Sequence, residues 1–323
     1  MKARALWVTG PRQAVLREEA LAPPAGDEAL VRMLFSGLSR GTERLVFEGR
    51  VPASEHRRMR APMQVGDFPF PVKYGYCAVG RIEAGPAARL GETVFCLHPH
   101  QDLFLAPATM CVPLPRGLPP PRAVLAANME TAMNILWDAR PLLGERALVV
   151  GAGVVGLLVA RLLARIPGLA VTVHDTDARK SAMAEAAGAR FLPAEALAPE
   201  HELVIHASGH PEGLRTALAA CAFEGRILEA SWFGTQEVTL PLGEAFHAGR
   251  ISLHSTQVGA VSPAMRGRRS HAERLALALA LLHDDAWYDG LLGEPVPFAA
   301  LPEALPSLLR GAEAPLCPLV TYI

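Results

Sequence analysis

The sequence predicts an α/β protein in which a β-rich part of barrel type is joined to a doubly wound parallel sheet. From Arg146 onward, short apolar strands alternate with helical stretches, and this alternation is typical of a parallel sheet. Before residue 115, the chain consists of short alternating apolar runs broken by Gly and Pro, which is typical of a barrel. After Leu291 the composition returns to Pro-rich short runs, so we expect the tail to be β-structured again.

The predicted elements divide the chain into three segments. The β-rich part is expected to hold strands at 3–8, 29–35, 77–84 and 92–97. Five prolines between Pro113 and Pro121 mark a boundary, and a helix is expected over 123–139. The parallel sheet is expected to hold strands at 147–150, 170–174, 202–207, 226–231 and 251–257, with helices at 157–166 and 271–283. We therefore expect a first domain over 1–120, a second over 121–284 and a tail over 285–323 that ends in a strand.

A glycine-rich turn carries the strongest functional signal. The apolar strand that ends at Val150 runs directly into Gly151-Ala152-Gly153-Val154-Val155-Gly156, and a helix follows. This is the fingerprint of a dinucleotide-binding βαβ unit. Gly151 allows the tight turn, Gly153 lets a pyrophosphate approach the backbone, and Gly156 lets the helix pack on the strand. The helix N-terminus, with the N–H groups of Val154 and Val155, is expected to bind the phosphates.

An acidic residue at the end of the second strand predicts the cofactor. Asp175 lies 19 residues after Gly156, where a carboxylate accepts hydrogen bonds from the adenosine-ribose hydroxyls. The same carboxylate repels a 2′-phosphate, so the sequence favours NAD over NADP. Arg179 and Lys180 are close enough in sequence to pair with such a phosphate, and they leave NADP as the alternative.

Composition and charge limit the class of protein. The 323 residues are half hydrophobic and carry 31 basic and 32 acidic side chains, a balance that argues against nucleic-acid binding. No apolar run reaches the roughly 18 residues that a membrane span needs, and the N-terminus does not look like a signal peptide. The five cysteines are scattered, without a C-x-x-C pair. We expect a cytoplasmic protein with free thiols.

The order of a β domain, a nucleotide-binding domain and a β tail resembles the medium-chain dehydrogenases/reductases. The specific anchors are the fingerprint with Asp175 and the segments 36–43, 75–82 and 91–94. Segment 36–43 also resembles locally the branch that contains bacteriochlorophyllide hydroxyethyl dehydrogenases, but we do not transfer the porphyrin substrate. The resemblance implies that the tail completes a GroES-like first domain and that the active site is a cleft between the domains.

The departures from this family concern zinc. Zinc-dependent members place a cysteine ligand near the position of Ser39 and a histidine ligand at that of Tyr76, so both ligands are lost here. The four clustered cysteines of a structural zinc lobe are absent as well. Cys77 with His98, His100 and Glu130 offers an improvised ligand set as the alternative. The sequence predicts a member without zinc.

Without zinc, side chains must stabilise the negative charge that hydride transfer builds on oxygen. Thr42 occupies the hydroxyl-relay region of the family, although it is equally suited to cap a helix over 43–47. Tyr76 stands where a metal ligand would be and could donate a proton, or it could be a packed aromatic. His98 and His100 are two residues apart, so on an extended segment both face the same side, where at least one is expected to line the substrate pocket.

Further residues are expected around the nicotinamide and the ribose. Glu130 begins the run that faces the nicotinamide in this architecture, or it forms a structural ion pair. Thr131 is suited to bind the carboxamide. Ser208 and Gly209 end one predicted strand near the adenosine ribose, whereas Ser231 and Gln257 end the next two near the nicotinamide, because ligands bind at the carboxyl ends of parallel strands.

The sequence thus predicts a zinc-independent, NAD(H)-dependent oxidoreductase that transfers hydride between the nicotinamide and a carbonyl or alcohol of a small organic substrate. One alternative is an NADPH-dependent enone or quinone reductase, a class that often lacks a dedicated proton donor. A nucleotide-binding sensor without turnover is the alternative outside the enzymes. A homodimer is expected, with no nucleic-acid or membrane partner.

Overall fold

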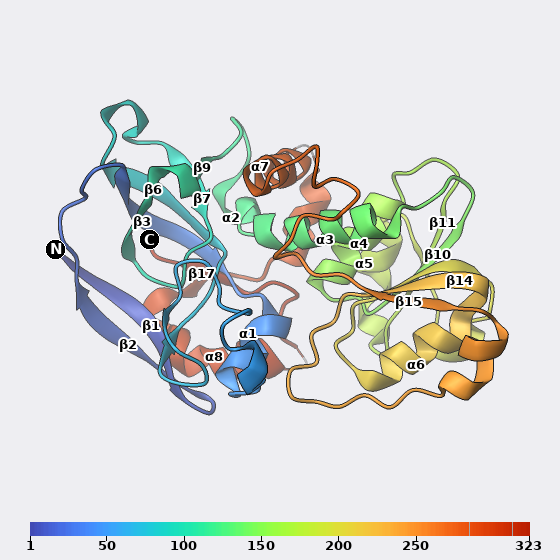
Figure 1. Cartoon of the computed structure of the whole chain (residues 1–323). Helices are drawn as coiled ribbons and strands as arrows, with labels where there is room; N and C mark the ends of the chain where they lie inside the picture. Colours follow the sequence, from blue (N-terminus) through green and yellow to red (C-terminus); the bar gives the residue numbers. More distant parts are fainter. Residues whose placement is uncertain (284, 312) are drawn as a thin grey trace. The chain divides into compact units, whose positions relative to one another are not determined.

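The computed structural model describes residues 1–283, 285–311 and 313–323, and the chain forms two compact units (Figure 1). The first unit contains Met1–Ala127 and Leu275–Ile323, and the second contains Asn128–Arg274. The C-terminal segment from Leu275 onward therefore belongs to the same unit as the N-terminus. The domain boundaries expected after residues 120 and 284 stay predictions.

Two sheets form the first unit. The smaller sheet has the order β2 (Gln13–Ala20), β1 (Lys2–Gly10), β5 (Val72–Lys73) and β4 (Val65–Gly66). The larger sheet has the order β16 (Val296–Pro297), β17 (Leu319–Thr321), β3 (Glu28–Gly37), β6 (Ala78–Ala84), β7 (Thr93–Cys96) and β9 (Val112–Pro113), and β8 (Leu103–Pro107) also pairs with β3. The tail strand β17 pairs antiparallel with β3, with Val320 opposite Ser36. This pairing places the end of the chain beside the motif that follows β3.

Helices of the first unit are α1 (Arg40–Phe47), α2 (Pro120–Ala123), α8 (Leu301–Arg310) and the larger part of α7 (His271–Leu281), while α3 (Ala126–Ala139) begins here and continues into the second unit. The core between the strands contains Val31, Met33, Ile82 and Phe104, each at most 1% exposed. These residues sit at alternate positions of β3 or on facing strands, so the period-2 pattern of the sequence is the pattern of burial.

The second unit is built on one parallel sheet of six strands. The strands are β10 (Arg146–Val150), β11 (Ala170–His174), β12 (Arg190–Phe191), β13 (His201–His206), β14 (Cys221–Glu229) and β15 (Ser252–Ser255), with helices α4 (Val154–Leu163), α5 (Ser181–Ala186) and α6 (Pro211–Ala220). The order across the sheet is β12-β11-β10-β13-β14-β15. If the six strands are numbered from 1 to 6 along the chain, this order is 3-2-1-4-5-6, which is the order of a dinucleotide-binding doubly wound sheet. The predicted α/β fold class is confirmed.

Burial explains why this sheet could be predicted. Residues 147–150 of β10 are at most 2% exposed, because helices cover both faces of a parallel sheet. By contrast, β2 was not predicted: it is an edge strand whose side chains are mostly exposed and include charged residues. The expected strand 251–257 is shorter in the structure, where β15 spans Ser252–Ser255 at the sheet edge.

The helix after β3 begins earlier than predicted. The sequence placed its start at Glu43, but α1 begins at Arg40 with Ser39 at the N-cap position. Thr42 therefore lies inside the first turn, and the interpretation of Thr42 as the helix cap is wrong.

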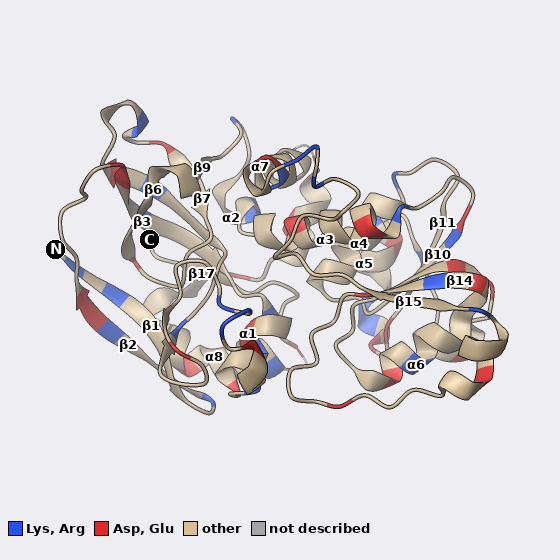
Figure 2. Cartoon of the chain, viewed as in Figure 1, with Lys and Arg blue, Asp and Glu red and all other residues tan. Residues whose placement is uncertain are grey.

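Acidic and basic residues are interspersed along the elements of both units (Figure 2). Among the described residues, no helix is long and apolar enough to cross a bilayer.

Candidate functional site

The three glycines of the fingerprint have three different surroundings. Gly151 has a φ of +109°, and a Cβ there would lie 2.7 Å from the Cα of Ser208. A Cβ on Gly156 would overlap the carbonyl oxygen of Gly151, so α4 approaches β10 this closely only with glycine. A Cβ on Gly153, in contrast, would meet nothing within 4 Å. Packing explains the first and third glycines, whereas the second borders open space.

Open space above Gly153 is what a bound pyrophosphate requires. Gly153 is the N-cap residue of α4 and has no side chain to cap the helix, so the first-turn N–H groups of Val154 and Val155 face outward along the helix axis. Together with the positive end of the helix dipole, these groups form an anion site. The residues present therefore fit the diphosphate of a dinucleotide.

Asp175 is tied to the same loop. Its Oδ2 accepts hydrogen bonds from the backbone N–H of Ala152 at 2.8 Å and from Lys180 Nζ at 2.9 Å, and its Oδ1 accepts the N–H of Asp177 at 2.9 Å. The side chain of Asp175 is 11% exposed. The carboxylate thus lies at the fingerprint loop, as the sequence led us to expect, but Lys180 neutralises part of its charge.

Arg179 is held by a different acid. Its Nε donates to Asp177 Oδ1 at 2.8 Å, and this pairing lowers the pKa of Asp177 to about 2. The guanidinium is therefore engaged in an exposed ion pair, the kind that contributes little to stability. Of the two basic residues, Lys180 is the one that contacts Asp175, and the cofactor contact predicted for Arg179 stays a prediction.

Strand ends bring the other predicted cofactor residues together. Ser208 and Gly209 follow β13, Ser231 follows β14, and the N–H of Gly209 donates to Ser231 Oγ at 3.0 Å. Gln257 follows β15 at the sheet edge, where its Oε1 accepts the N–H of Gly259 at 2.6 Å. All four residues lie beyond carboxyl ends of parallel strands, where the fold places ligands.

Glu130, on α3, forms a buried ion pair. Its Oε1 accepts from Arg274 Nε at 3.0 Å, and the two side chains are 6% and 4% exposed. Arg274 also donates to Asn134 Oδ1 at 2.9 Å and to the carbonyl of Val258 at 2.7 Å. Burial raises the pKa of Glu130, and the charge of Arg274 counteracts the rise. This geometry supports the structural alternative for Glu130; Thr131, the next residue, is half-buried on the same helix.

The first unit contains a buried chain of hydrogen bonds centred on His100. The Nε2 of His100 lies 2.9 Å from Glu43 Oε2, and its Nδ1 lies 2.7 Å from Ser36 Oγ. The other oxygen of Glu43 accepts the N–H of Ser39 at 2.8 Å. Ser36 Oγ lies 2.9 Å from the hydroxyl of Tyr322, so the chain reaches the C-terminal tail. Since His100 is 1% exposed and Glu43 7%, this is an imidazole–carboxylate pair held out of water.

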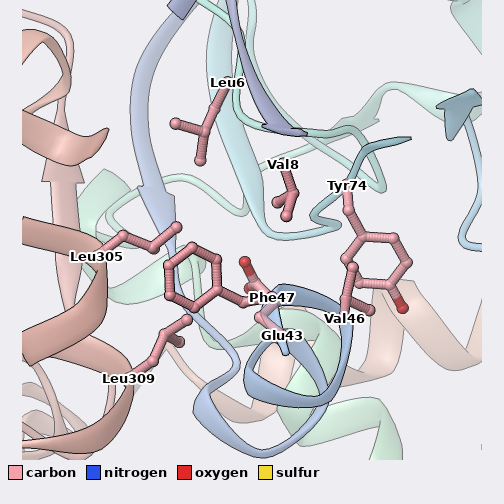
Figure 3. A pocket seen from close by; sticks show the side chains of 8 residues that line it. All are labelled: Leu6, Val8, Glu43, Val46, Phe47, Tyr74, Leu305 and Leu309. Carbon is pink, nitrogen blue, oxygen red and sulfur yellow. The ribbon is translucent and has the colours of Figure 1, made fainter. Parts of the chain in front are cut away.

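A small apolar cavity borders the carboxylate of Glu43. Figure 3 shows Glu43 with Phe47 of α1, Leu6 and Val8 of β1, and Leu305 of α8, and the remaining lining residues are Val46, Tyr74 and Leu309. Glu43 is the charged residue among these eight. A carboxylate beside apolar walls needs its hydrogen-bond partners, and Ser39 and His100 supply them.

Tyr76 lies in the same region of the first unit. It is half-buried, and its ring stands 5.9 Å from that of Tyr74 in an edge-on arrangement. Burial raises the pKa of Tyr76 well above its usual value, and a hydrogen bond with Ser39 offsets part of the rise. The phenol is therefore protonated at neutral pH and is a hydrogen-bond donor. Thr42 is half-buried on α1, one residue before Glu43.

His98 and His100 do not share surroundings, contrary to the same-face expectation. A hydrogen bond from the N–H of His98 to the carbonyl of Cys96, at 2.9 Å, turns the chain at Leu97, so the alternation of an extended segment does not apply. The ring of His98 stacks on Phe104 at 3.8 Å and is bonded to the carbonyl of Pro99. Burial lowers the pKa of His98 to about 3, so this imidazole is neutral and packed.

Two participants of the His100 chain were missed by sequence reasoning, and a third was undervalued. Ser36 ends β3 and Tyr322 follows β17, and their contact depends on the pairing of those strands. The sequence left Glu43, like Thr42, undecided between the relay region and a structural role in the first helical turn. The capping-box pattern does not find it, because that pattern places the acid three residues after the N-cap, whereas Glu43 accepts the N–H of Ser39 from four residues away.

The improvised zinc ligands are engaged elsewhere. Both ring nitrogens of His100 have partners, His98 stacks on Phe104, and Glu130 pairs with Arg274 in the second unit. Over the residues that the structure describes, no three His, Cys, Asp or Glu side chains are grouped as ligands of one metal ion. The expectation that the protein works without zinc still stands on the sequence and is a prediction.

Comparison with curated proteins finds dehydrogenases. The 2-desacetyl-2-hydroxyethyl bacteriochlorophyllide A dehydrogenase of Cereibacter sphaeroides is 29% identical over 270 residues, which cover 76% of this chain and 79% of that protein. The D-guloside 3-dehydrogenase of Escherichia coli is 24% identical over 274 residues, which cover 76% of each chain. No family model matches the sequence.

Comparison with solved structures finds the same fold. An alcohol dehydrogenase from Escherichia coli in complex with NADH has a TM-score of 0.77 at 16% identity, over 99% of both chains. A protein from Sinorhizobium meliloti, described as a zinc-binding dehydrogenase and solved with NADP bound, has a TM-score of 0.78 at 15% identity, also over 99% of both chains. The fold is that of the alcohol-dehydrogenase-like proteins, and the resemblance stated from the sequence is confirmed.

Proposed function

Because the chain is an NAD(P)-dependent oxidoreductase of the medium-chain dehydrogenase/reductase type, we propose that it is a zinc-independent dehydrogenase that prefers NAD(H). It would interconvert a carbonyl and an alcohol in a small organic molecule. The observation that carries the proposal is the free space above Gly153 beside the N-terminus of α4, with the carboxylate of Asp175 bonded to the same loop.

The fingerprint loop and α4 would hold the diphosphate, and Asp175 would accept a ribose hydroxyl with the remaining capacity of Oδ1. When bound, the nicotinamide supplies or accepts the hydride. Electron density then builds on the substrate oxygen, and a hydrogen-bond donor stabilises it. Tyr76, protonated and half-buried, is the donor that we assign to this oxygen.

His100 would take part in the proton transfer of the reaction. A carboxylate only accepts hydrogen bonds, so Glu43 holds a proton on Nε2 of His100 and orients the ring. Nδ1 then exchanges a proton with the Ser36 hydroxyl, which contacts the phenol of Tyr322. These buried groups together have the donors and acceptors of a proton relay.

A second candidate function is an NADPH-dependent enone or quinone reductase, and one contact favours it. Lys180 lies 2.9 Å from Asp175 and reduces the repulsion that Asp175 exerts on a 2′-phosphate. The neighbour from Sinorhizobium meliloti was solved with NADP, whereas the one from Escherichia coli was solved with NADH. The two candidates differ in which reduced cofactor binds more tightly.

Gly153 and Gly156 provide a matched pair of variants for a test of cofactor binding. In Gly153→Ala the new methyl group enters open space, so the melting temperature should stay within about 2 °C while NADH affinity falls at least tenfold. Gly156→Ala is the control, because its methyl group overlaps the carbonyl of Gly151 and should lower stability itself. Affinity is measured by NADH fluorescence titration and stability by thermal unfolding. Undiminished NADH binding by Gly153→Ala would refute the placement of the diphosphate.

A further inference from the structure

His206 stands at the carboxyl end of β13, opposite Glu229 at the end of β14 in the parallel register. It is fully buried, with an exposed fraction of 0%. Its Nδ1 lies 2.7 Å from Glu229 Oε2, and its Nε2 lies 2.6 Å from Ser208 Oγ. A carboxylate, an imidazole and a hydroxyl are thus joined in one line within the second unit.

The chemistry of the three groups fixes the direction of each hydrogen bond. Glu229 can only accept, so Nδ1 of His206 carries a proton and donates it. Of the two acceptors near the Ser208 hydroxyl, Nε2 of His206 at 2.6 Å is much closer than the carbonyl of His210 at 3.5 Å, so the hydroxyl points its hydrogen at His206. One lone pair of Ser208 Oγ accepts the N–H of His210 at 3.1 Å. The remaining lone pair is left as an acceptor for a group outside the protein, because Ser208 is half-buried.

The second oxygen of Glu229 fixes the neighbouring loop. Oε1 accepts the N–H of Ser231 at 2.7 Å, and Ser231 Oγ accepts the N–H of Gly209 at 3.0 Å. The loops that follow β13 and β14 are therefore bonded to each other through Glu229. Any group that binds at Ser208 meets a surface whose hydrogen-bond directions are already set, which lowers the ordering cost of binding.

This assembly lies at the point where the strand order of the sheet reverses, between β10 and β13. The backbone of Ser208 packs on Gly151, since a Cβ on that glycine would lie 2.7 Å from both the Cα and the N of Ser208. On the other side, a Cβ at Gly213 of α6 would collide with Ser208 Oγ and lie 2.8 Å from His206 Nε2. The two glycines leave room for the hydroxyl–imidazole contact directly beside the fingerprint loop.

We propose that Glu229 and His206 are positioning residues that orient Ser208 as a hydrogen-bond acceptor for a ribose hydroxyl of the bound dinucleotide. The inference rests on the proposed function, which puts the dinucleotide on the fingerprint loop. The O–H donors of an unphosphorylated dinucleotide are its ribose hydroxyls, so a hydroxyl fixed as an acceptor beside this loop matches them. His206 and Glu229 act through Ser208 and do not touch the cofactor.

The test is a double-mutant cycle on NADH affinity, measured by fluorescence titration of the full chain. Ser208→Ala removes the acceptor and should weaken NADH binding by about 3- to 10-fold, the effect of one ordinary hydrogen bond. His206→Gln should weaken binding by a similar factor, because one glutamine amide cannot reach Glu229 and Ser208 together. The double variant should bind NADH no more weakly than Ser208→Ala alone, since His206 acts only through that hydroxyl.

His201→Gln is the matched control. This histidine is on the same strand, is 2% exposed and bonds the carbonyl of Ala220 through Nδ1, but it lies at the opposite end of β13. It should leave NADH affinity unchanged. Thermal unfolding of each variant shows whether a loss of affinity comes from a loss of fold, and Ser208→Ala keeps the test decisive because a half-buried hydroxyl is removed without a cavity.

The inference is overturned if His206→Gln binds NADH like wild type, or if the two substitutions add fully. The inference alone fails if three results are found together: the wild-type protein binds NADH, Gly153→Ala abolishes this binding, and the Ser208 and His206 variants bind NADH like wild type. If the wild-type protein binds neither NADH nor NADPH, the proposed function fails with it.

Discussion

Replacing Glu43 with glutamine tests the proton relay with the smallest change in shape. In the structure, one carboxylate oxygen accepts the N–H of Ser39 at 2.8 Å and the other faces His100 Nε2 at 2.9 Å. A glutamine can keep its oxygen on Ser39, and its NH₂ group then points at Nε2. That nitrogen must become an acceptor, so the proton of the imidazole moves to Nδ1 and the direction of the Ser36 contact reverses.

The magnitude follows from what is lost. A hydrogen bond to a charged group is worth about 1.5–3 kcal/mol and a neutral one about 0.5–1.5 kcal/mol, so stability should fall by about 1–2 kcal/mol. For a unit of this size that corresponds to roughly 2–8 °C in melting temperature. Turnover should fall by about 10²-fold or more, because an imidazole in the wrong tautomer no longer exchanges its proton in the required direction.

The assay is steady-state turnover over pH together with NADH titration. Glu43→Gln should lose one limb of the pH–rate profile while its NADH affinity stays within about twofold, since the fingerprint is in the other unit. Glu48→Gln is the control: this glutamate caps the same helix, its side chain is 7% exposed, and it pairs with Arg310. If Glu43→Gln turns over a true substrate at the wild-type rate with an unchanged pH profile, His100 is not part of proton transfer.

The other substitutions address packing and cofactor choice. The pKa of His98 is about 3 in the folded state and about 6.5 in the unfolded chain, so the free energy of unfolding should fall by roughly 1.4 kcal/mol per pH unit as the pH drops from 6.5 to 3. His98→Gln should flatten this slope in acid-unfolding curves. The control is His247→Gln, at an exposed histidine, which should leave the slope unchanged. Arg274→Met leaves the buried carboxylate of Glu130 without its cation and should lower the free energy of unfolding, measured with denaturant, by about 3–5 kcal/mol. A loss below about 1 kcal/mol would contradict a structural role for the pair. Asp175→Ser should weaken NADH by roughly 10- to 100-fold and narrow its advantage over NADPH in fluorescence titration; tighter NADPH binding by the wild type would reverse the cofactor assignment.

The fingerprint could be predicted because its constraints are local. Gly156 is required by the carbonyl of Gly151 in the same turn, and Gly151 by its own φ of +109°, so the pattern of letters carries the geometry. The parallel sheet was equally predictable, since burial on both faces leaves continuous apolar runs such as 147–150. Edge strands were less predictable, because their solvent-facing residues weaken the pattern: β2 was missed, and β15 was found but expected to be longer than it is.

Pairings across long sequence separations could not be predicted. Glu43 and His100 are 57 residues apart, and their contact exists because α1 and the loop after β7 pack in the same unit. Glu130 and Arg274 are 144 residues apart, and the sequence left their ion pair as one of two alternatives. The expectation that His98 and His100 face the same side was wrong for a local reason, since one turn at Leu97 cancels the alternation on which it relied; that one of them lines the substrate pocket stays a prediction.

Hydride transfer from NADH without zinc is the activity that we propose for this chain. To test it, the protein is treated exhaustively with a chelator, and elemental analysis confirms that zinc is absent. Deuterium transfer is then measured from NADH deuterated at C4 to a panel of small carbonyl compounds. We expect deuterium to appear on the carbinol carbon of a product at a rate that added zinc does not raise. About one tightly held zinc per chain, with transfer lost on its removal and restored on its return, would contradict the claim.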